Sequence, residues 1–218
     1  MEDIDAIALL QDPVRRRLYE FVAAQGREVG RNEAAEAAGV ARTLAAFHLD
    51  KLVDAGLLEA GSRRLSGRSG PGAGRPAKVY RRSAVERGVS VPARDYRTAA
   101  GLLAEAAEVA GLDMELQDAA RRTGRALRGP AGTVGALDGL AGVLAERGYE
   151  PVPDEGGGVL RMRNCPFHAV AEQFPPLVCG MNLALLEGLT EGSGVRVRMD
   201  PRPGWCCVAA EPSKNNQD

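Results

Sequence analysis

The chain of 218 residues is long enough for one large domain or two small ones, and at 44% hydrophobic residues it can build well-packed cores. Its formal net charge of −1 argues neither for nor against a nucleic-acid partner. No stretch reaches the ~18 apolar residues of a membrane span, and the acidic N-terminus has no long apolar run, so we expect a cytoplasmic protein without a membrane partner.

The charges and the cysteines are unevenly distributed. Residues 61–87 hold eight Lys or Arg residues and one acid, whereas residues 91–218 hold 13 basic and 17 acidic residues. This asymmetry favours an N-terminal segment that faces phosphates and an acidic remainder. All four cysteines lie between positions 165 and 207. In a cytosolic chain, such a cluster indicates metal or redox chemistry more than structural disulfides.

The first part of the chain carries the start and stop signals of three helices. Asp12 and Pro13 are typical of a helix N-cap and first helical position, and apolar residues then recur at helical spacing until Gly26. A short second helix is expected over 32–38 and a third from about 41 to 55, each followed by a glycine.

Two short strands follow these helices. The strands are expected at 57–59 and 78–81, on either side of a loop rich in glycine, serine and arginine. A helix, a helix-turn-helix and a two-stranded wing, in this order, are typical of the winged-helix domain that binds double-stranded DNA.

The third helix has two different faces on a helical wheel. The inner face is expected to pack on the first two helices, with its histidine as a hydrogen-bonded core residue. The outer face offers an arginine for guanine or phosphate, a threonine for either, and a phenylalanine for a thymine methyl, although an ordinary solvated face is the alternative. The inner set is Leu44, Ala45, His48, Leu49 and Leu52, and the outer set is Arg42, Thr43, Ala46, Phe47 and Asp50.

The loop between the two strands is strongly basic. It lies where a wing would meet the DNA backbone or minor groove, and arginines there would supply salt-dependent attraction to phosphates. A flexible, solvated loop is the alternative. The candidate contacts are Arg63, Arg64, Arg68, Arg75 and the strand residue Lys78.

The run FHLDKLVDAGLL, with GRPAKVYR some fifteen residues later, resembles the ArsR-like winged-helix regulators of bacteria. More narrowly, it is similar to the branch that includes the iron–sulfur repressor of the Suf cluster-assembly operon. The resemblance covers residues ~10–85. It implies a homodimer on a palindromic operator, with repression as the commoner mode.

The pattern as a whole predicts an α+β protein. We expect a winged helix-turn-helix domain over 1–88, a linker with dimerisation helices over 89–130, a small α+β sensor domain over 131–211, and a disordered tail over 212–218. The central helices carry a stripe of leucine, alanine and valine that suits dimerisation. The sensor domain reads helix, two strands, helix, and a final hairpin with strands at 195–198 and 205–209.

The chemistry of the sensor domain lies in its cysteines and one histidine. The spacing is Cys165-x2-His168, ten residues, Cys179, twenty-six residues, and then Cys206-Cys207. Soft thiolates select zinc or iron–sulfur clusters. These residues come from the end of a strand, a helix and the final hairpin, which can converge on one edge of the domain. The alternative is that the cysteines act as small core hydrophobes.

The resemblance extends to these residues. Regulators of the Suf-repressor branch have a comparable Asn-Cys-Pro motif, a mid-helix cysteine and C-terminal cysteines that hold an iron–sulfur cluster, and Cys165, Cys179 and one of Cys206 and Cys207 match that pattern. Neighbouring side chains in a strand point to opposite faces. We therefore expect one of the pair to ligate, with His168 as the candidate fourth ligand. A four-cysteine cluster, a cluster with one other ligand, and zinc all stay open.

Three functions are compatible with these residues. The favoured one is a DNA-binding repressor whose C-terminal domain senses iron–sulfur, metal or redox status. The second is a winged-helix regulator of a small organic effector, with structural or zinc-bound cysteines. The third is an enzyme that uses Cys165 and His168 as nucleophile and base. No orienting acid or oxyanion motif stands near that pair, so we expect no enzyme.

Overall fold

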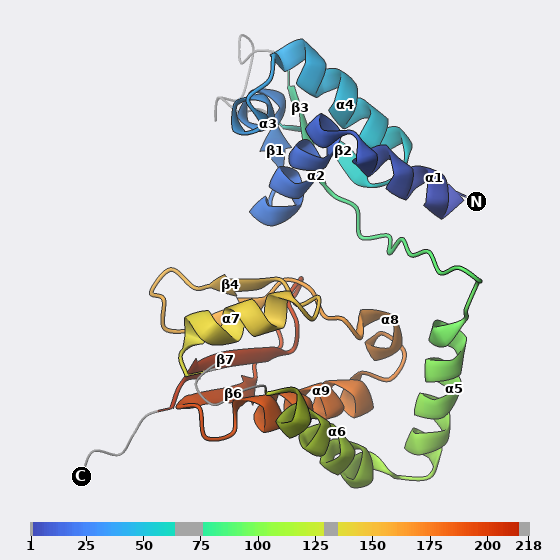
Figure 1. Cartoon of the computed structure of the whole chain (residues 1–218), viewed down its shortest axis with the longest axis vertical. Coiled ribbons are helices and arrows are strands. Elements are labelled where there is room, and N and C mark those ends of the chain that lie inside the picture. The colour runs from blue at the N-terminus through green and yellow to red at the C-terminus, as the bar shows by residue number, and fades with distance from the viewer. Residues whose placement is uncertain (1, 64–75, 129–134, 214–218) are drawn as a thin grey trace. The chain divides into compact units, whose positions relative to one another are not determined.

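The computed structural model describes residues 2–63, 76–128 and 135–213. Backbone contacts divide the chain into two units, Met1–Arg94 and Asp95–Asp218 (Figure 1). Three of the predicted wing arginines, Arg64, Arg68 and Arg75, lie outside the described residues, as does most of the predicted tail. No helix in the described ranges is long and apolar enough to cross a membrane.

The N-terminal unit consists of helices packed on a small sheet. Its helices are α1 (Glu2–Ala8), the 3-10 helix η1 (Leu9–Gln11), α2 (Pro13–Gln25), α3 (Arg31–Ala38) and α4 (Arg42–Asp54). Helices α2, α3 and α4 contact one another and enclose the core of the unit.

Local signals begin and end these helices as the sequence predicts. The Asp12 carboxylate accepts hydrogen bonds from the backbone N–H groups of Val14 and Arg15 at 2.9 and 3.0 Å, which caps α2. Gly26 and Gly39 follow α2 and α3 with φ of 60° and 65°, a left-handed conformation that glycine adopts without steric cost.

The sheet of the N-terminal unit has three antiparallel strands. They are β1 (Val29–Gly30), β2 (Leu58–Arg63) and β3 (Ala77–Arg82), in the order β1-β3-β2. The hairpin of β2 and β3 pairs Ala60 with Tyr80, so both strands are longer than the sequence predicts. Strand β1 and helix α1 are absent from the sequence-based prediction because both are too short to carry a periodic pattern.

The C-terminal unit has five helices among its described residues. They are α5 (Tyr96–Val109), α6 (Asp113–Leu127), α7 (Leu137–Ala145), the short α8 (His168–Ala171) and α9 (Pro175–Thr190). Gly111, with φ of 65°, separates α5 from α6 and provides the break that the sequence suggests.

The strands of the C-terminal unit form one antiparallel sheet. They are β4 (Pro151–Pro153), β5 (Leu160–Met162), β6 (Val195–Met199) and β7 (Val208–Pro212), in the order β4-β5-β7-β6. Apart from the short helix α8, which the prediction lacks, the element order agrees with the prediction, and the last strand begins three residues later than predicted. Arg161 of β5 is buried and donates a 2.5 Å hydrogen bond to Asp200, which follows β6.

Helices α6 and α9 cross with their backbones nearly touching. A Cβ added to Gly124 would lie 2.0 Å from the carbonyl oxygen of Leu185, and one added to Gly188 would lie 2.1 Å from that of Arg121. Ion pairs flank the crossing, including Arg121 with Glu187 at 2.8 Å. Helix α6 therefore belongs to the same unit as α9, whereas the sequence suggested a separate segment of linker and dimerisation helices.

Helix α5 turns its larger side chains toward solvent. None of its residues is buried, and Leu102, Leu103 and Val109 are exposed, Leu103 by 72%. The half-buried side of the helix carries small residues instead, namely Ala100, Gly101, Ala104 and Ala107. Helix α5 contacts α8, α9 and α6.

Candidate DNA interface and cysteine cluster

The outer face of α4 presents the residues that the helical wheel assigned to DNA. Arg42 and Thr43 are exposed at its N-terminal end, Phe47 is 56% exposed, and Ala46 is half-buried. An aromatic ring exposed to this extent in the middle of a helix contributes little to the core. Arg42, Thr43 and Phe47 are therefore accessible on this face.

The opposite face of α4 differs from the prediction at two residues. Leu44 lies at the edge of the buried arc and is 42% exposed, so it extends the outer face instead of the core. His48 is buried at 7% exposure, but its Nδ1 has no hydrogen-bond partner among the described residues. Its ring meets the edge of Phe47 at 5.2 Å between centroids.

Asp50 joins α4 to the wing strand and to α3. Its carboxylate accepts hydrogen bonds from the Tyr80 hydroxyl at 2.7 Å and from Lys78 Nζ at 2.8 Å, and Arg31 Nη2 lies at 3.3 Å. Arg31 also donates from Nε to the Tyr80 hydroxyl at 2.8 Å. Lys78 thus lies in a network within the protein, and Asp50 of the predicted outer set pairs with α3 and β3 while its side chain stays 42% exposed.

The network sets the protonation of its members. Burial raises the pKa of Asp50, but the hydrogen bonds from Lys78 and Tyr80 outweigh that effect and leave the pKa lowered. Burial, together with the hydrogen bond to Asp50, raises the pKa of Tyr80 to about 12. At neutral pH Asp50 is therefore a carboxylate and Tyr80 a neutral phenol.

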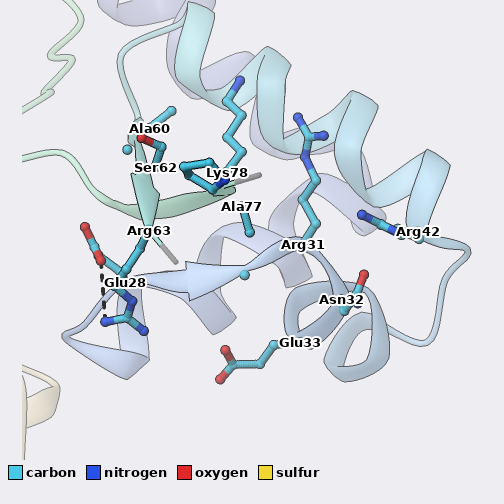
Figure 2. A pocket seen from close by; sticks show the side chains of 13 residues that line it. Glu28, Arg31, Asn32, Glu33, Arg42, Ala60, Ser62, Arg63, Ala77 and Lys78 are labelled. Atoms are coloured by element: carbon cyan, nitrogen blue, oxygen red, sulfur yellow. Dashed lines mark ion pairs between the residues drawn. The ribbon is translucent and has the colours of Figure 1, made fainter. Parts of the chain in front are cut away.

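A groove of about 1030 Å³ opens between the N-terminal ends of α3 and α4 and the strands of the wing (Figure 2). Figure 2 shows the side chains of Arg31, Arg42 and Lys78 on the side of the groove that α4 forms, with Arg42 directed toward Arg31. Arg63 lies near β1, where it pairs with Glu28 at 3.5 Å. Arg31 was absent from the predicted contacts, since a basic residue at a helix start looks like any solvated charge.

The second candidate site gathers the cysteines of the C-terminal unit. Cys165 follows β5 in the loop before α8, Cys179 lies in α9, and Cys206 and Cys207 directly precede β7. The backbone N–H of Cys206 donates to the carbonyl of Met162 at 2.8 Å, which ties the last segment to β5.

The four thiols lie near one another in a row from Cys165 through Cys206 and Cys207 to Cys179, because each of Cys165, Cys206 and Cys207 has a pKa shifted by the next thiol. The fully buried Asn182 donates to the Cys206 sulfur at 3.4 Å and accepts a 2.5 Å hydrogen bond from the Tyr149 hydroxyl. The expected convergence of three segments is therefore present.

Cys206 is a buried thiol that lies between two others in the row. Hydrogen bonds from Cys165 and Cys207 lower the pKa of Cys206 to about 3, and the Val208 backbone N–H and Asn182 add to the effect. The same hydrogen bonds, together with burial, raise the pKa of Cys165 and of Cys207. Thiol, amide and backbone donors thus surround the sulfur of Cys206.

Two expectations for this site stay predictions. Cys206 and Cys207 precede β7, so the alternation of side chains in a strand does not by itself decide which of them would ligate. His168 begins α8 with its side chain 65% exposed, and its Nε2 lies 3.3 Å from Glu172. The backbone N–H of His168 donates to the carbonyl of Cys165 at 3.0 Å, while its exposed side chain pairs with Glu172.

The donor set can be compared with the groups that it would hold. Among the described residues, no three His, Cys, Asp or Glu side chains are arranged to hold a single metal ion. An iron–sulfur cluster distributes cysteine ligands over several iron atoms and does not need them to meet at one point. The four thiols therefore fit such a cluster in their chemistry.

Comparison with known proteins bears on the N-terminal unit. Neither the curated proteins nor the solved structures include a match to the chain. Residues 9–60, which run from η1 into β2, match the family model described as a helix-turn-helix domain. The chain thus contains a helix-turn-helix domain of the kind that serves DNA-binding transcription regulators and not enzymes.

Proposed function

We propose that the chain is an ArsR-like transcription repressor that binds a palindromic operator as a homodimer, and whose four cysteines bind an iron–sulfur cluster that controls DNA binding. The observation that carries the proposal is the row of thiols built from three separate segments beside a buried amide. Cysteine thiolates are the ligands that iron–sulfur clusters take.

The helix α5 supports the homodimer. A helix that packs small residues on its own unit and exposes leucines loses free energy in water unless a partner covers it. A second copy of the same helix is the natural partner in a protein that reads two half-sites.

The loop before α8 supports a connection between the cysteines and that surface. Cys165 lies three residues before α8, and α5 packs on α8. A bound cluster would supply a redox-sensitive centre with cysteine ligands. Cys165, Cys179, Cys206 and Cys207 would hold it, and Asn182 would donate to the sulfur of Cys206.

Purification without oxygen tests the cluster. We expect a coloured protein with iron and sulfide, and we expect Cys206→Ser to lose both while remaining folded by circular dichroism. His168→Ala is the matched control and keeps the iron, because this side chain is exposed and pairs with Glu172. A colourless wild-type protein without iron contradicts the proposal. If the protein contains zinc and no iron, the cysteines bind a structural metal instead of a cluster.

Selection from a random duplex library tests the operator. The wild type, with its cluster, is expected to enrich a sequence with two-fold symmetry, and the cluster-free Cys206→Ser variant is expected to enrich it less. Equal enrichment by both proteins would show that the cluster on the cysteines does not control DNA binding.

Light scattering tests the dimer surface. Leu103→Glu is expected to shift the protein from dimer to monomer, since it places a charge on the exposed face of α5. Met199→Glu on β6, also exposed, is the control and leaves the dimer intact. A wild type that is monomeric at all concentrations contradicts this part of the proposal.

A further inference from the structure

The groove between α3, α4 and the wing carries more positive than negative charge. Its two glutamates are each engaged by an arginine, Glu28 by Arg63 and Glu33 by Arg27. Because both glutamates are paired in this way, they do not neutralise the charges of Arg31, Arg42 and Lys78 on the α4 side of the groove.

The cations on the α4 side share one carboxylate. Arg31 and Lys78 both pair with Asp50, so this trio keeps a net positive charge. Arg42 adds another, and it forms no ion pair with the residues that the structure describes. A narrow region with excess positive charge attracts polyanions.

Arg31 differs from an ordinary surface arginine because its guanidinium is held in place. Its Nε donates to the Tyr80 hydroxyl, its Nη2 contacts Asp50, and its Cζ lies 5.9 Å from the centre of the Tyr80 ring. These contacts occupy one edge of the group, and the side chain is still 30% exposed. The other N–H donors of Arg31 have no hydrogen bond to the residues that the structure describes and can bind an anion.

We propose that the groove takes the sugar–phosphate backbone of DNA and that Arg31 binds a phosphate there, with Tyr80 as its positioning residue. The inference rests on the proposed DNA-binding function and adds a contact to it. A guanidinium matches the oxygens of a phosphate in a two-pronged contact, and a rotamer fixed beforehand lowers the entropy lost on binding.

The salt dependence of DNA binding tests the proposal without knowledge of the operator. The full-length protein is titrated onto a fluorescent duplex of about 30 base pairs of mixed sequence, between about 50 and 200 mM salt. Each phosphate contact adds about 0.9 to the slope of log K against log salt. Arg31→Ala is therefore expected to weaken binding several-fold and to reduce the slope by about that amount for each bound protomer.

Arg17→Ala is the matched control. Arg17 lies on α2, is exposed, and carries the same charge, but it is not part of the groove. We expect its slope to stay close to that of the wild type.

Two further variants separate charge from position. Arg31→Lys keeps the charge but not the planar fork, and is expected to retain the slope at reduced affinity. Tyr80→Phe removes the hydroxyl that holds Arg31 and is expected to lower affinity a few-fold with the slope unchanged. Both variants also keep the proposal falsifiable should Arg31→Ala fail to fold.

The outcomes distinguish this inference from the function on which it rests. If the wild type binds no duplex at the lowest salt, the proposed DNA-binding function falls and this inference falls with it. If the wild type binds and Arg31→Ala has the slope of Arg17→Ala, only the role of Arg31 is overturned. Wild-type affinity in Tyr80→Phe would overturn the positioning role of Tyr80.

Discussion

Replacing Gly188 by alanine perturbs the crossing of α6 and α9 with one methyl group. Its carbon would lie 2.1 Å from the carbonyl oxygen of Arg121 and 3.1 Å from the Cα of the same residue, where ordinary contacts begin near 3.4 Å. Both atoms belong to the backbone of α6, so no side chain can rotate away. The two helices must separate by roughly 1 Å.

The cost follows from this separation. Overpacking typically destabilises a core by about 1–3 kcal/mol, and alanine recovers about 1 kcal/mol through its better helix propensity. A rigid backbone contact belongs at the upper end of that range, since it also disturbs ion pairs such as Arg121 with Glu187. We expect the free energy of unfolding to fall by about 2 kcal/mol.

Urea unfolding measures this loss. The chain has a single tryptophan, Trp205, so its fluorescence reports on the C-terminal unit. Gly142→Ala is the control, because Gly142 lies inside α7 with nothing within 4 Å of an added Cβ, and it is expected to gain up to about 1 kcal/mol. Equal stability of Gly188→Ala and Gly142→Ala would refute the reasoning.

Three further predictions concern the core, the pH response and the buried amide. Leu49→Ala is expected to cost about 2–5 kcal/mol, and Leu44→Ala less than about 0.5 kcal/mol, because the first side chain is fully buried and the second is not; hydrogen exchange of the α4 amides compares them, and equal protection would contradict the assigned burial. The hydrogen bond from the side chain of Arg161 lowers the pKa of Asp200. Its contribution to stability is therefore present above pH ~4 and lost as the pH falls through the lowered pKa, so Asp200→Asn should flatten the acid limb of the tryptophan-monitored stability profile; an unchanged limb would count against it. Asn182→Leu is expected to cost about 1–3 kcal/mol despite its apolar side chain, since it leaves the buried Tyr149 hydroxyl without its acceptor. The double variant with Tyr149→Phe should recover part of that loss in urea unfolding, and strict additivity would argue against the bond.

The helices of the N-terminal unit were predictable because their ends are encoded locally. An aspartate before a proline and glycines with positive φ mark helix boundaries whatever the rest of the chain does. Strand β1 has two residues and exists only because β3 lies beside it, so no local pattern could predict it. Leu44 was misassigned because a wheel locates the centre of a buried arc better than its edge.

The residues of the two sites are brought together by contacts between segments that are far apart in the sequence, so local patterns predicted them only in part. The spacing of the cysteines indicated that three segments could converge, and they do. The part played by both Cys206 and Cys207 depends on where β7 begins, which periodicity could not fix. The position of Arg31 depends on its hydrogen bond to Tyr80 of β3. The two residues are 49 positions apart in the sequence, so no local pattern could predict this contact.

The packing of α5 on α8 has a consequence for the direction in which a signal can travel. Cys165 precedes α8 by three residues, and the exposed leucines belong to α5. If occupancy of the cysteines changes the affinity of two protomers for each other, thermodynamic reciprocity requires pairing to change the affinity of the cysteines for their ligand by the same factor. In the proposed repressor, protein paired on DNA would then hold that ligand with a different affinity from unpaired protein. The DNA sequence would thereby influence when the ligand is bound or lost.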